Sequence, residues 1–210
     1  MRVSRSLLAA SVALCVALPA AAQSVGVLQS AETMDRGVFK LMLAPIMVFG
    51  EDDAESEFGL AARAGYGFTD RFDAEAKLGF FENSTVVGAD GELWIVRGEE
   101  PDSGLDFSVA GGVHWAFGKS GHQDTMGFEI TPLLSGHVTG NLELCGALAA
   151  SFESIQDAPA GMDDSFTSLY IVPGVEYRLS DAADLVGEVG IALNDESSTY
   201  AGIGIAYYLR

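Results

Sequence analysis

The stretch YAGIGIAYYL, residues 200–209, alternates between two kinds of side chain. If the backbone is extended, the odd-numbered positions carry mostly bulky apolar residues, and the even-numbered positions carry Gly202, Gly204, Ala206 and Tyr208. Successive side chains of a β-strand point to opposite faces, so this pattern predicts a strand between two unlike environments.

The same alternation recurs through most of the chain. Short polar segments such as Thr69-Asp70-Arg71 and Thr139-Gly140-Asn141 separate the alternating runs and are typical of hairpin turns. We therefore expect about ten antiparallel strands, with eight to twelve possible. The expected strands are 37–49, 57–68, 72–82, 85–97, 105–118, 125–138, 142–154, 166–179, 184–194 and 197–210.

The composition of the two faces decides the fold class. A soluble sheet shows polar side chains to water, whereas the second face here is mostly Gly, Ala and Ser with scattered charges. Small residues suit the interior of a narrow barrel, and the bulky apolar face suits lipid. The prediction is an all-β, closed, antiparallel transmembrane β-barrel, and the alternative is a secreted soluble β-protein. Aromatic residues near strand ends would form two interfacial girdles: Phe49, Phe58, Phe68, Phe72, Phe80, Trp115, Phe117, Phe152, Phe166, Tyr177, Tyr200 and Tyr207.

The N-terminal residues are expected to be a targeting segment. A positively charged start precedes the apolar run Leu7–Leu18 and the small residues Ala20–Ala22, which predicts a signal peptide over 1–22. Its removal takes away Cys15 and leaves Cys145 without an internal disulfide partner. The remaining residues divide into a periplasmic N-terminal tail, 23–36, and a barrel domain, 37–210. No later stretch is apolar for 18 residues, so no transmembrane helix is expected.

The overall charge excludes one class of partner. The 210 residues contain 11 Lys and Arg against 30 Asp and Glu, for a formal net charge of −19. Because a phosphate backbone is bound by an excess of Lys and Arg, this composition argues against nucleic-acid binding. The hydrophobic share of 49% argues against a disordered acidic chain.

Three prolines lie inside predicted strands. Pro45, Pro132 and Pro173 each lack the N–H group that a ladder needs. A closed barrel has no free edge for them, so we expect a bulge or a local gap at each.

These features together resemble the small outer-membrane β-barrel proteins of Gram-negative bacteria. The pieces YIVPGVEYRLSDAADL and GYGFTDRFDAEAKLG are similar to the strand–turn–strand units of that family. The resemblance implies a location in the cell outer membrane, contact with membrane lipid and lipopolysaccharide, and insertion by the barrel-assembly machinery. It also implies that the last strand carries the assembly signal, here with Tyr200, Gly202, Tyr207 and Leu209, although the chain ends in Leu209-Arg210 where the family usually has Phe or Trp.

Charged residues on the small-residue face are expected in the lumen. A symmetric turn around Asp70 would place Arg63 opposite Lys77 with Glu75 diagonal to Arg63. A symmetric turn at Ser180–Asp184 would place Glu176 opposite Glu188 with Arg178 nearby. Isolated charges in a narrow lumen are costly, so we expect these six residues to form an ion network that lines or fills it.

The outer loops raise two further possibilities. Asp52, Asp53, Asp163 and Asp164 are candidates for binding divalent cations at the outer rim, although none has the spacing of a calcium loop. The adjacent His122 and Asp124 could activate water, as a rim hydrolase would require. An isolated His–Asp pair in a polar loop is common, so no enzymatic activity is expected, and no cofactor.

Three functions follow from these observations. The first is a structural or surface-interaction barrel with a largely filled lumen. The second is a narrow passive pore for small solutes or cations, which the acidic excess would favour. The third is the rim hydrolase.

Overall fold

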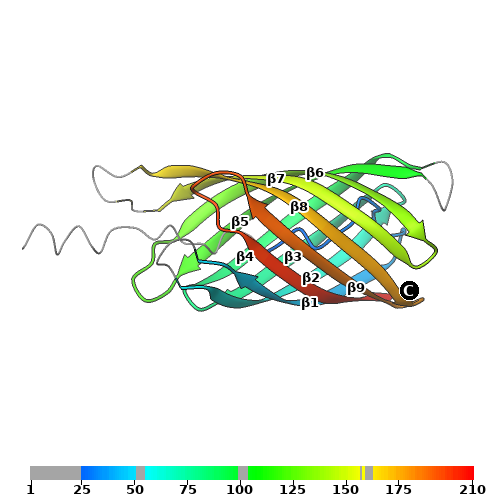
Figure 1. Ribbon diagram of the computed structural model, residues 1–210, viewed down its shortest axis with the longest axis horizontal. Helices are drawn as coiled ribbons and strands as arrows, with labels where there is room; N and C mark the ends of the chain where they lie inside the picture. Colours follow the sequence, from blue (N-terminus) through cyan, green and yellow to red (C-terminus); the bar gives the residue numbers. More distant parts are fainter. Residues whose placement is uncertain (1–24, 51–54, 99–103, 157, 159–162) are drawn as a thin grey trace, which may run out of the picture.

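The chain forms a closed β-barrel (Figure 1). Neighbouring strands are antiparallel, consecutive strands pair with each other, and β10 closes the barrel by pairing with β1. The ten expected strands are confirmed, with ends within a few residues of the predicted ones. The strands are β1 (Phe39–Val48), β2 (Glu57–Thr69), β3 (Phe72–Phe81), β4 (Ser84–Val96), β5 (Leu105–Gly118), β6 (Thr125–Thr139), β7 (Leu142–Ile155), β8 (Ser165–Ser180), β9 (Ala183–Ala192) and β10 (Tyr200–Leu209).

The structure is a computed structural model that describes residues 25–50, 55–98, 104–156, 158 and 163–210. The expected signal peptide and the loop residues Asp52 and Asp53 lie outside these ranges. Within them, no helix has the length and apolar character needed to cross a membrane.

Most strand residues alternate between an outward and an inward face. In β1 every second residue is buried, and the intervening residues are exposed. The exposed positions carry large apolar side chains, including Leu43 (59% exposed), Leu105 (62%) and Val113 (61%). An apolar surface that surrounds the molecule is unfavourable in water and suits lipid.

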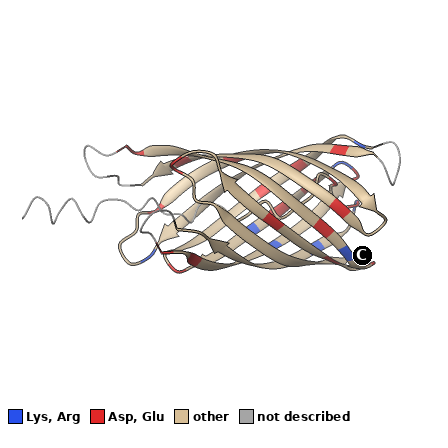
Figure 2. Ribbon diagram, in the orientation of Figure 1, with Lys and Arg blue, Asp and Glu red and all other residues tan. Residues whose placement is uncertain are grey.

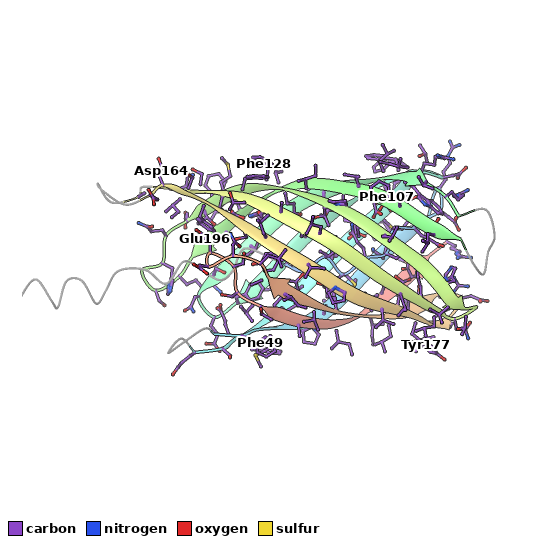
Figure 3. The ribbon with its side chains drawn as sticks, turned by 45° about the horizontal axis from the view of Figure 1, so that its top comes forward. Phe49, Phe107, Phe128, Asp164, Tyr177 and Glu196 are labelled. Carbon is purple, nitrogen blue, oxygen red and sulfur yellow. The ribbon has the colours of Figure 1, made fainter. Side chains whose placement is uncertain are left out.

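Aromatic residues on outward positions lie toward both ends of the barrel. Figure 3 shows Phe49 and Phe128 toward one end and Phe107 and Tyr177 toward the other. This arrangement agrees with two girdles at the membrane interfaces. Tyr200 is an exception to the predicted girdles: it is 2% exposed and packs edge-to-face on Tyr170 inside the barrel, with ring centroids 5.6 Å apart.

One end of the barrel, the turn end, is built from similar short connections. The β2–β3, β6–β7 and β8–β9 connections each have two residues between the strands. In each, a hydroxyl closes the turn by accepting an N–H group two residues later: Thr69 from Arg71, Thr139 from Asn141 and Ser180 from Ala182. A register shift accompanies each turn. The opposite end, the loop end, carries the β1–β2, β3–β4, β5–β6, β7–β8 and β9–β10 connections.

The three strand prolines each coincide with a local gap, as predicted. Pairing of β1 with β10 stops at Leu43 and resumes at Ile46, on either side of Pro45, without a change of register. The β6–β7 ladder is interrupted in the same way around Pro132, and the β8–β9 ladder around Pro173. Each proline therefore faces one neighbour without a ladder bond and keeps its pairing with the other strand.

The N-terminal segment Val25–Arg36 runs inside the barrel (Figure 1, dark blue). Val25, Leu28 and Ala31 are buried in the same cluster as Ile46, and Met34 is also buried. The sequence predicted a periplasmic tail over 23–36, and for the described residues 25–36 this prediction is wrong. The physical reason is that the lumen offers both apolar contacts and charged hydrogen-bonding groups to the segment. We call Val25–Arg36 the luminal segment.

Candidate functional site

The luminal segment is bound to the barrel wall through its backbone. Glu188 of β9 accepts hydrogen bonds from the N–H groups of Val27 (2.8 Å) and Leu28 (2.6 Å). Ser135 of β6 accepts one from Ala31 (3.1 Å). These contacts matter because buried backbone N–H groups need a partner once they leave water. The segment is therefore held by specific bonds as well as by apolar burial.

A second group of contacts lies near the two ends of the segment. Asp73 of β3 accepts a hydrogen bond from the N–H group of Met34 at 2.8 Å. Arg63 of β2 donates to the carbonyl oxygen of Val27 and to Oε1 of Gln29, the latter at 2.7 Å. Strands β2, β3, β6 and β9 thus all contact the segment, which crosses the interior between them.

Arg63 also belongs to an ion network in the lumen. Its Nε lies 2.6 Å from Glu75 Oε2, and its Nη2 lies 3.1 Å from Asp90 Oδ2. Lys77 pairs with Asp90 at 2.8 Å and also with Glu129, and Lys40 pairs with Glu75. Three cations and three carboxylates are therefore joined, so the charges largely compensate one another (Figure 2 shows the charged residues along the strands).

The structure brings together half of the predicted network. Arg63 is paired with Lys77 across β2 and β3, and Glu75 lies diagonal to Arg63, as predicted. Glu188 is placed elsewhere, where it binds the luminal segment. Glu176 and Arg178 also lie apart from the network, at the turn end of the lumen.

The predicted pairing of Glu176 with Glu188 is wrong. Glu176 pairs with Val186, and Glu188 pairs with Gly174. The prediction centred the turn on Ala182. The pairs Glu176–Val186 and Arg178–Asp184 are instead centred on Asp181, one position earlier, just as the β2–β3 pairs are centred on Asp70.

Three members of the network were not among the predicted site residues: Lys40, Asp90 and Glu129. All three lie on inward positions of their strands, so the alternation could have identified them. Lys40 and Asp90 lie in β1 and β4, where bulky residues occupy both odd and even positions. Glu129 meets Lys77 across the lumen from a strand that is not its neighbour, a contact that no hairpin register reveals.

A cavity of about 150 Å³ opens beside the luminal segment at the turn end. Its lining includes Glu176, Arg178 and Asp184 of the barrel and Glu32 of the segment. A smaller cavity of about 30 Å³ lies nearby, between Glu32, His137, Glu143 and these residues. The segment therefore narrows the lumen to small polar spaces at this end.

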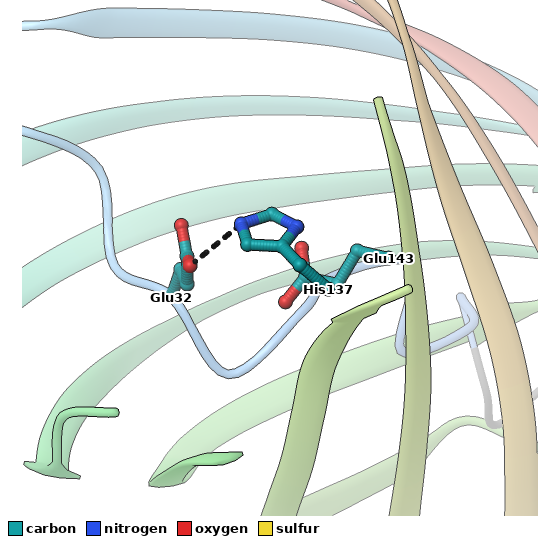
Figure 4. A group of neighbouring side chains, drawn as sticks. All are labelled: Glu32, His137 and Glu143. Carbon is teal, nitrogen blue, oxygen red and sulfur yellow. Dashed lines mark ion pairs between the residues drawn. The ribbon is translucent and has the colours of Figure 1, made fainter. Parts of the chain in front are cut away.

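Glu32, His137 and Glu143 form a group beside the smaller cavity (Figure 4). His137 Nε2 lies 3.2 Å from Glu32 Oε1, and one ligand atom from each residue lies within 4.8 Å of the others. His137 and Glu143 face each other across β6 and β7. A different histidine, His114 of β5, is buried on the inward face of its strand, and its Nε2 lies 2.8 Å from Glu153 Oε1.

The predicted loop-end residues have local contacts. His122 Nδ1 lies 2.8 Å from the carbonyl oxygen of Lys119, and Asp124 Oδ1 accepts a hydrogen bond from the Gly118 N–H group. Asp163 and Asp164 are exposed at the start of β8. Because Asp52 and Asp53 lie outside the described residues, cation binding at this rim stays a prediction.

The predicted assembly residues divide between the two faces of β10. Tyr207 and Leu209 are exposed on the outer surface, whereas Tyr200 and Gly202 lie on the inward-facing positions. Only Tyr207 and Leu209 are therefore accessible from outside the barrel. Cys145 is a half-buried free thiol on an inward position of β7.

Similar barrels occur among solved structures. An outer-membrane channel from Pseudomonas putida F1 matches with a TM-score of 0.57 and 10% sequence identity, over 85% of this chain and 98% of that chain. The KdgM porin matches with a TM-score of 0.45 and 12% identity, over 81% of this chain and 99% of that chain. OprG from Pseudomonas aeruginosa matches with a TM-score of 0.41 and 14% sequence identity, over 87% of this chain and 100% of that chain. No protein-family model and no curated protein matches the chain. The match to the Pseudomonas putida channel shows that the two chains share the closed-barrel fold, as the hairpin pattern predicted.

Proposed function

We propose that this protein is an outer-membrane β-barrel whose lumen is closed by its own luminal segment. The observation that carries the proposal is the pair of hydrogen bonds from Val27 and Leu28 to Glu188 in the middle of β9. They hold a buried peptide across the space that a pore would need. The barrel in this state has a structural or surface-interaction role and does not conduct.

Charge and packing support a closed lumen. The network of Lys40, Arg63, Lys77, Glu75, Asp90 and Glu129 lines the barrel interior with mutually paired side chains. Arg63 joins this network to the luminal segment. A solute would have to displace the segment, which Arg63 holds through the carbonyl oxygen of Val27 and the side chain of Gln29.

The location and assembly of the barrel are part of the proposal. A cleaved signal peptide over 1–22 would export the chain, and Tyr207 and Leu209 would present the assembly signal on the outer face of β10. The turn end would face the periplasm, and the lipid-facing surface would contact lipid and lipopolysaccharide. No chemistry is assigned to His122 and Asp124, because both side chains already stabilise the β5–β6 loop.

Planar-bilayer recording tests this function directly. The refolded chain should show no steady conductance, whereas a variant that lacks residues 23–36 and keeps all ten strands should conduct. Heat-modifiable gel migration would establish that both proteins are folded. Steady conductance by the complete chain, or silence of the folded deletion variant, would contradict the proposal and favour another arrangement of the lumen.

A further inference from the structure

We infer that Glu32, His137 and Glu143 form a binding site for a first-row divalent metal ion of the Zn²⁺ class. The site lies at the turn end of the lumen, far from the acidic loops that the sequence singled out for cations. It joins one residue of the luminal segment to two residues of the barrel wall.

The three side chains are close enough to share an ion. Their ligand atoms lie within 4.8 Å of one another. Two ligands of one tetrahedral Zn²⁺ ion, each about 2.0–2.2 Å from the metal, lie about 3.3–3.6 Å apart. The flexible carboxylates of Glu32 and Glu143 therefore need to close the gap by about 1–1.5 Å between them, which side-chain rotation can supply.

Glu143 provides a second, independent indication of a ligand. The residue is only 4% exposed, and its Oε1 has no hydrogen-bond partner among the described residues. His137 Nδ1 is likewise buried without a partner among them. An unsatisfied buried carboxylate oxygen is expensive, and a bound ion or an ordered water is the usual reason that one persists. Figure 4 shows the Glu143 carboxylate beside the His137 ring.

The surroundings have the space and the charge for a cation. A cavity of about 30 Å³ adjoins the three residues, enough for an ion or a water that completes its coordination. Glu176 and Asp184 also line this cavity, and Arg178 is its single cationic lining residue. The carboxylates outnumber the positive charges, so a divalent ion would reduce the local repulsion.

The ligand chemistry selects the class of metal. One imidazole and two carboxylates are the donors that Zn²⁺ and its first-row neighbours accept, whereas Ca²⁺ and Mg²⁺ are bound by oxygen donors alone. Glu32 belongs to the luminal segment, whereas His137 and Glu143 belong to β6 and β7. A bound ion would therefore fasten the segment to the wall. This consequence rests on the proposed closure of the lumen, but metal binding itself does not.

Isothermal titration of the refolded chain with ZnCl₂ tests the site. One equivalent of Zn²⁺ should bind, with Ca²⁺ unable to compete. His137→Ala should lower the affinity by at least about tenfold, because even residues that only support a metal ligand contribute this much. The matched control is His122→Ala, which removes a half-buried histidine at the loop end and should leave Zn²⁺ binding unchanged.

A second variant makes the test independent of barrel folding. Glu32→Gln changes only the luminal segment, outside every strand, and should also weaken Zn²⁺ binding. Absence of Zn²⁺ binding to the complete chain, equal affinity of the wild type and His137→Ala, or preferential binding of Ca²⁺ would overturn the inference. A chain that binds Zn²⁺ at this site but conducts steadily would contradict the closed lumen and leave the metal site standing.

Discussion

Glu188 and Leu28 are joined by a hydrogen bond of 2.6 Å between residues 160 positions apart in the sequence. The carboxylate of Glu188 belongs to a wall strand, and the N–H group of Leu28 belongs to a segment that has no strand partner. The same carboxylate also accepts the N–H group of Val27. One side chain thus holds two consecutive peptide groups inside the barrel.

Replacing Glu188 should loosen the luminal segment. In Glu188→Ala both N–H groups lose their charged acceptor, and such a bond contributes about 1.5–3 kcal/mol. Amide hydrogen exchange at Val27 and Leu28 should therefore accelerate roughly 10- to 100-fold. Glu176→Gln is the matched control, because Glu176 accepts no described hydrogen bond from the segment and exchange should stay unchanged. Equal protection in wild type and Glu188→Ala would show that apolar burial alone holds the segment.

Arg63 should be the most sensitive position of the ion network. Arg63→Met leaves Glu75 and Asp90 without one of their cations and frees the carbonyl oxygen of Val27. Breaking a buried pair in this way should lower the free energy of unfolding by about 3–5 kcal/mol. Urea unfolding in lipid vesicles, followed by tryptophan fluorescence, measures the change.

An exposed arginine provides the comparison for Arg63. Arg71 lies in the β2–β3 turn, and Arg71→Ala should change the free energy of unfolding by no more than about 0.5 kcal/mol. Similar effects of the two substitutions would mean that the luminal network contributes little to stability.

The cost of placing a charge on the lipid-facing surface should depend on the depth of that position in the membrane. Leu43 lies in the middle of β1 and is 59% exposed, so Leu43→Arg should destabilise the barrel by about 2–4 kcal/mol in a bilayer. Leu105, at the turn end of β5, is equally exposed, but Leu105→Arg should cost only about 0–1 kcal/mol near the interface. Equilibrium unfolding of the two variants in vesicles of the same lipid compares their free energies of unfolding. Equal costs would argue against a membrane centred on the middle of the strands.

Gly190 is required by the position of the Tyr200 ring. The two residues are cross-strand partners, and a Cβ atom at Gly190 would approach Tyr200 Cε1 to 1.9 Å. Gly190→Ala should therefore displace the ring or bend the strand and cost about 1–3 kcal/mol. At Gly146 nothing lies within 4 Å of an added Cβ, so Gly146→Ala is the control and should not destabilise the barrel. The midpoints of urea unfolding of the two variants distinguish these outcomes.

Much of the barrel was predictable because its signals are local. The alternation in β10 identifies both faces of the strand, and the Thr or Ser that opens each short turn identifies where a hairpin reverses. The ladder gaps at Pro45, Pro132 and Pro173 follow from the missing N–H group. These features depend on neighbouring residues only, so no knowledge of the tertiary structure is needed to find them.

The site was less predictable because its contacts cross the lumen. The Arg63–Lys77 pairing follows from a turn centred on Asp70, but centring the β8–β9 turn on Ala182 instead of Asp181 was enough to misplace Glu176 relative to Glu188. The contact between Lys77 and Glu129 joins strands that are not neighbours. It depends on the curvature of the closed barrel, and the sequence of a hairpin contains no measure of that curvature.

The amino-acid sequence by itself determined the ten strands, the face on which most of their side chains lie, and an apolar outer surface. The tertiary structure decided what fills the interior. Four of the hydrogen bonds between the luminal segment and the wall come from backbone N–H groups, which nearly every residue possesses, so the side chains of residues 25–36 do not identify the wall residues that accept them. Only closure of the barrel brings Glu188, Asp73 and Ser135 around one path and gives that segment a place to lie.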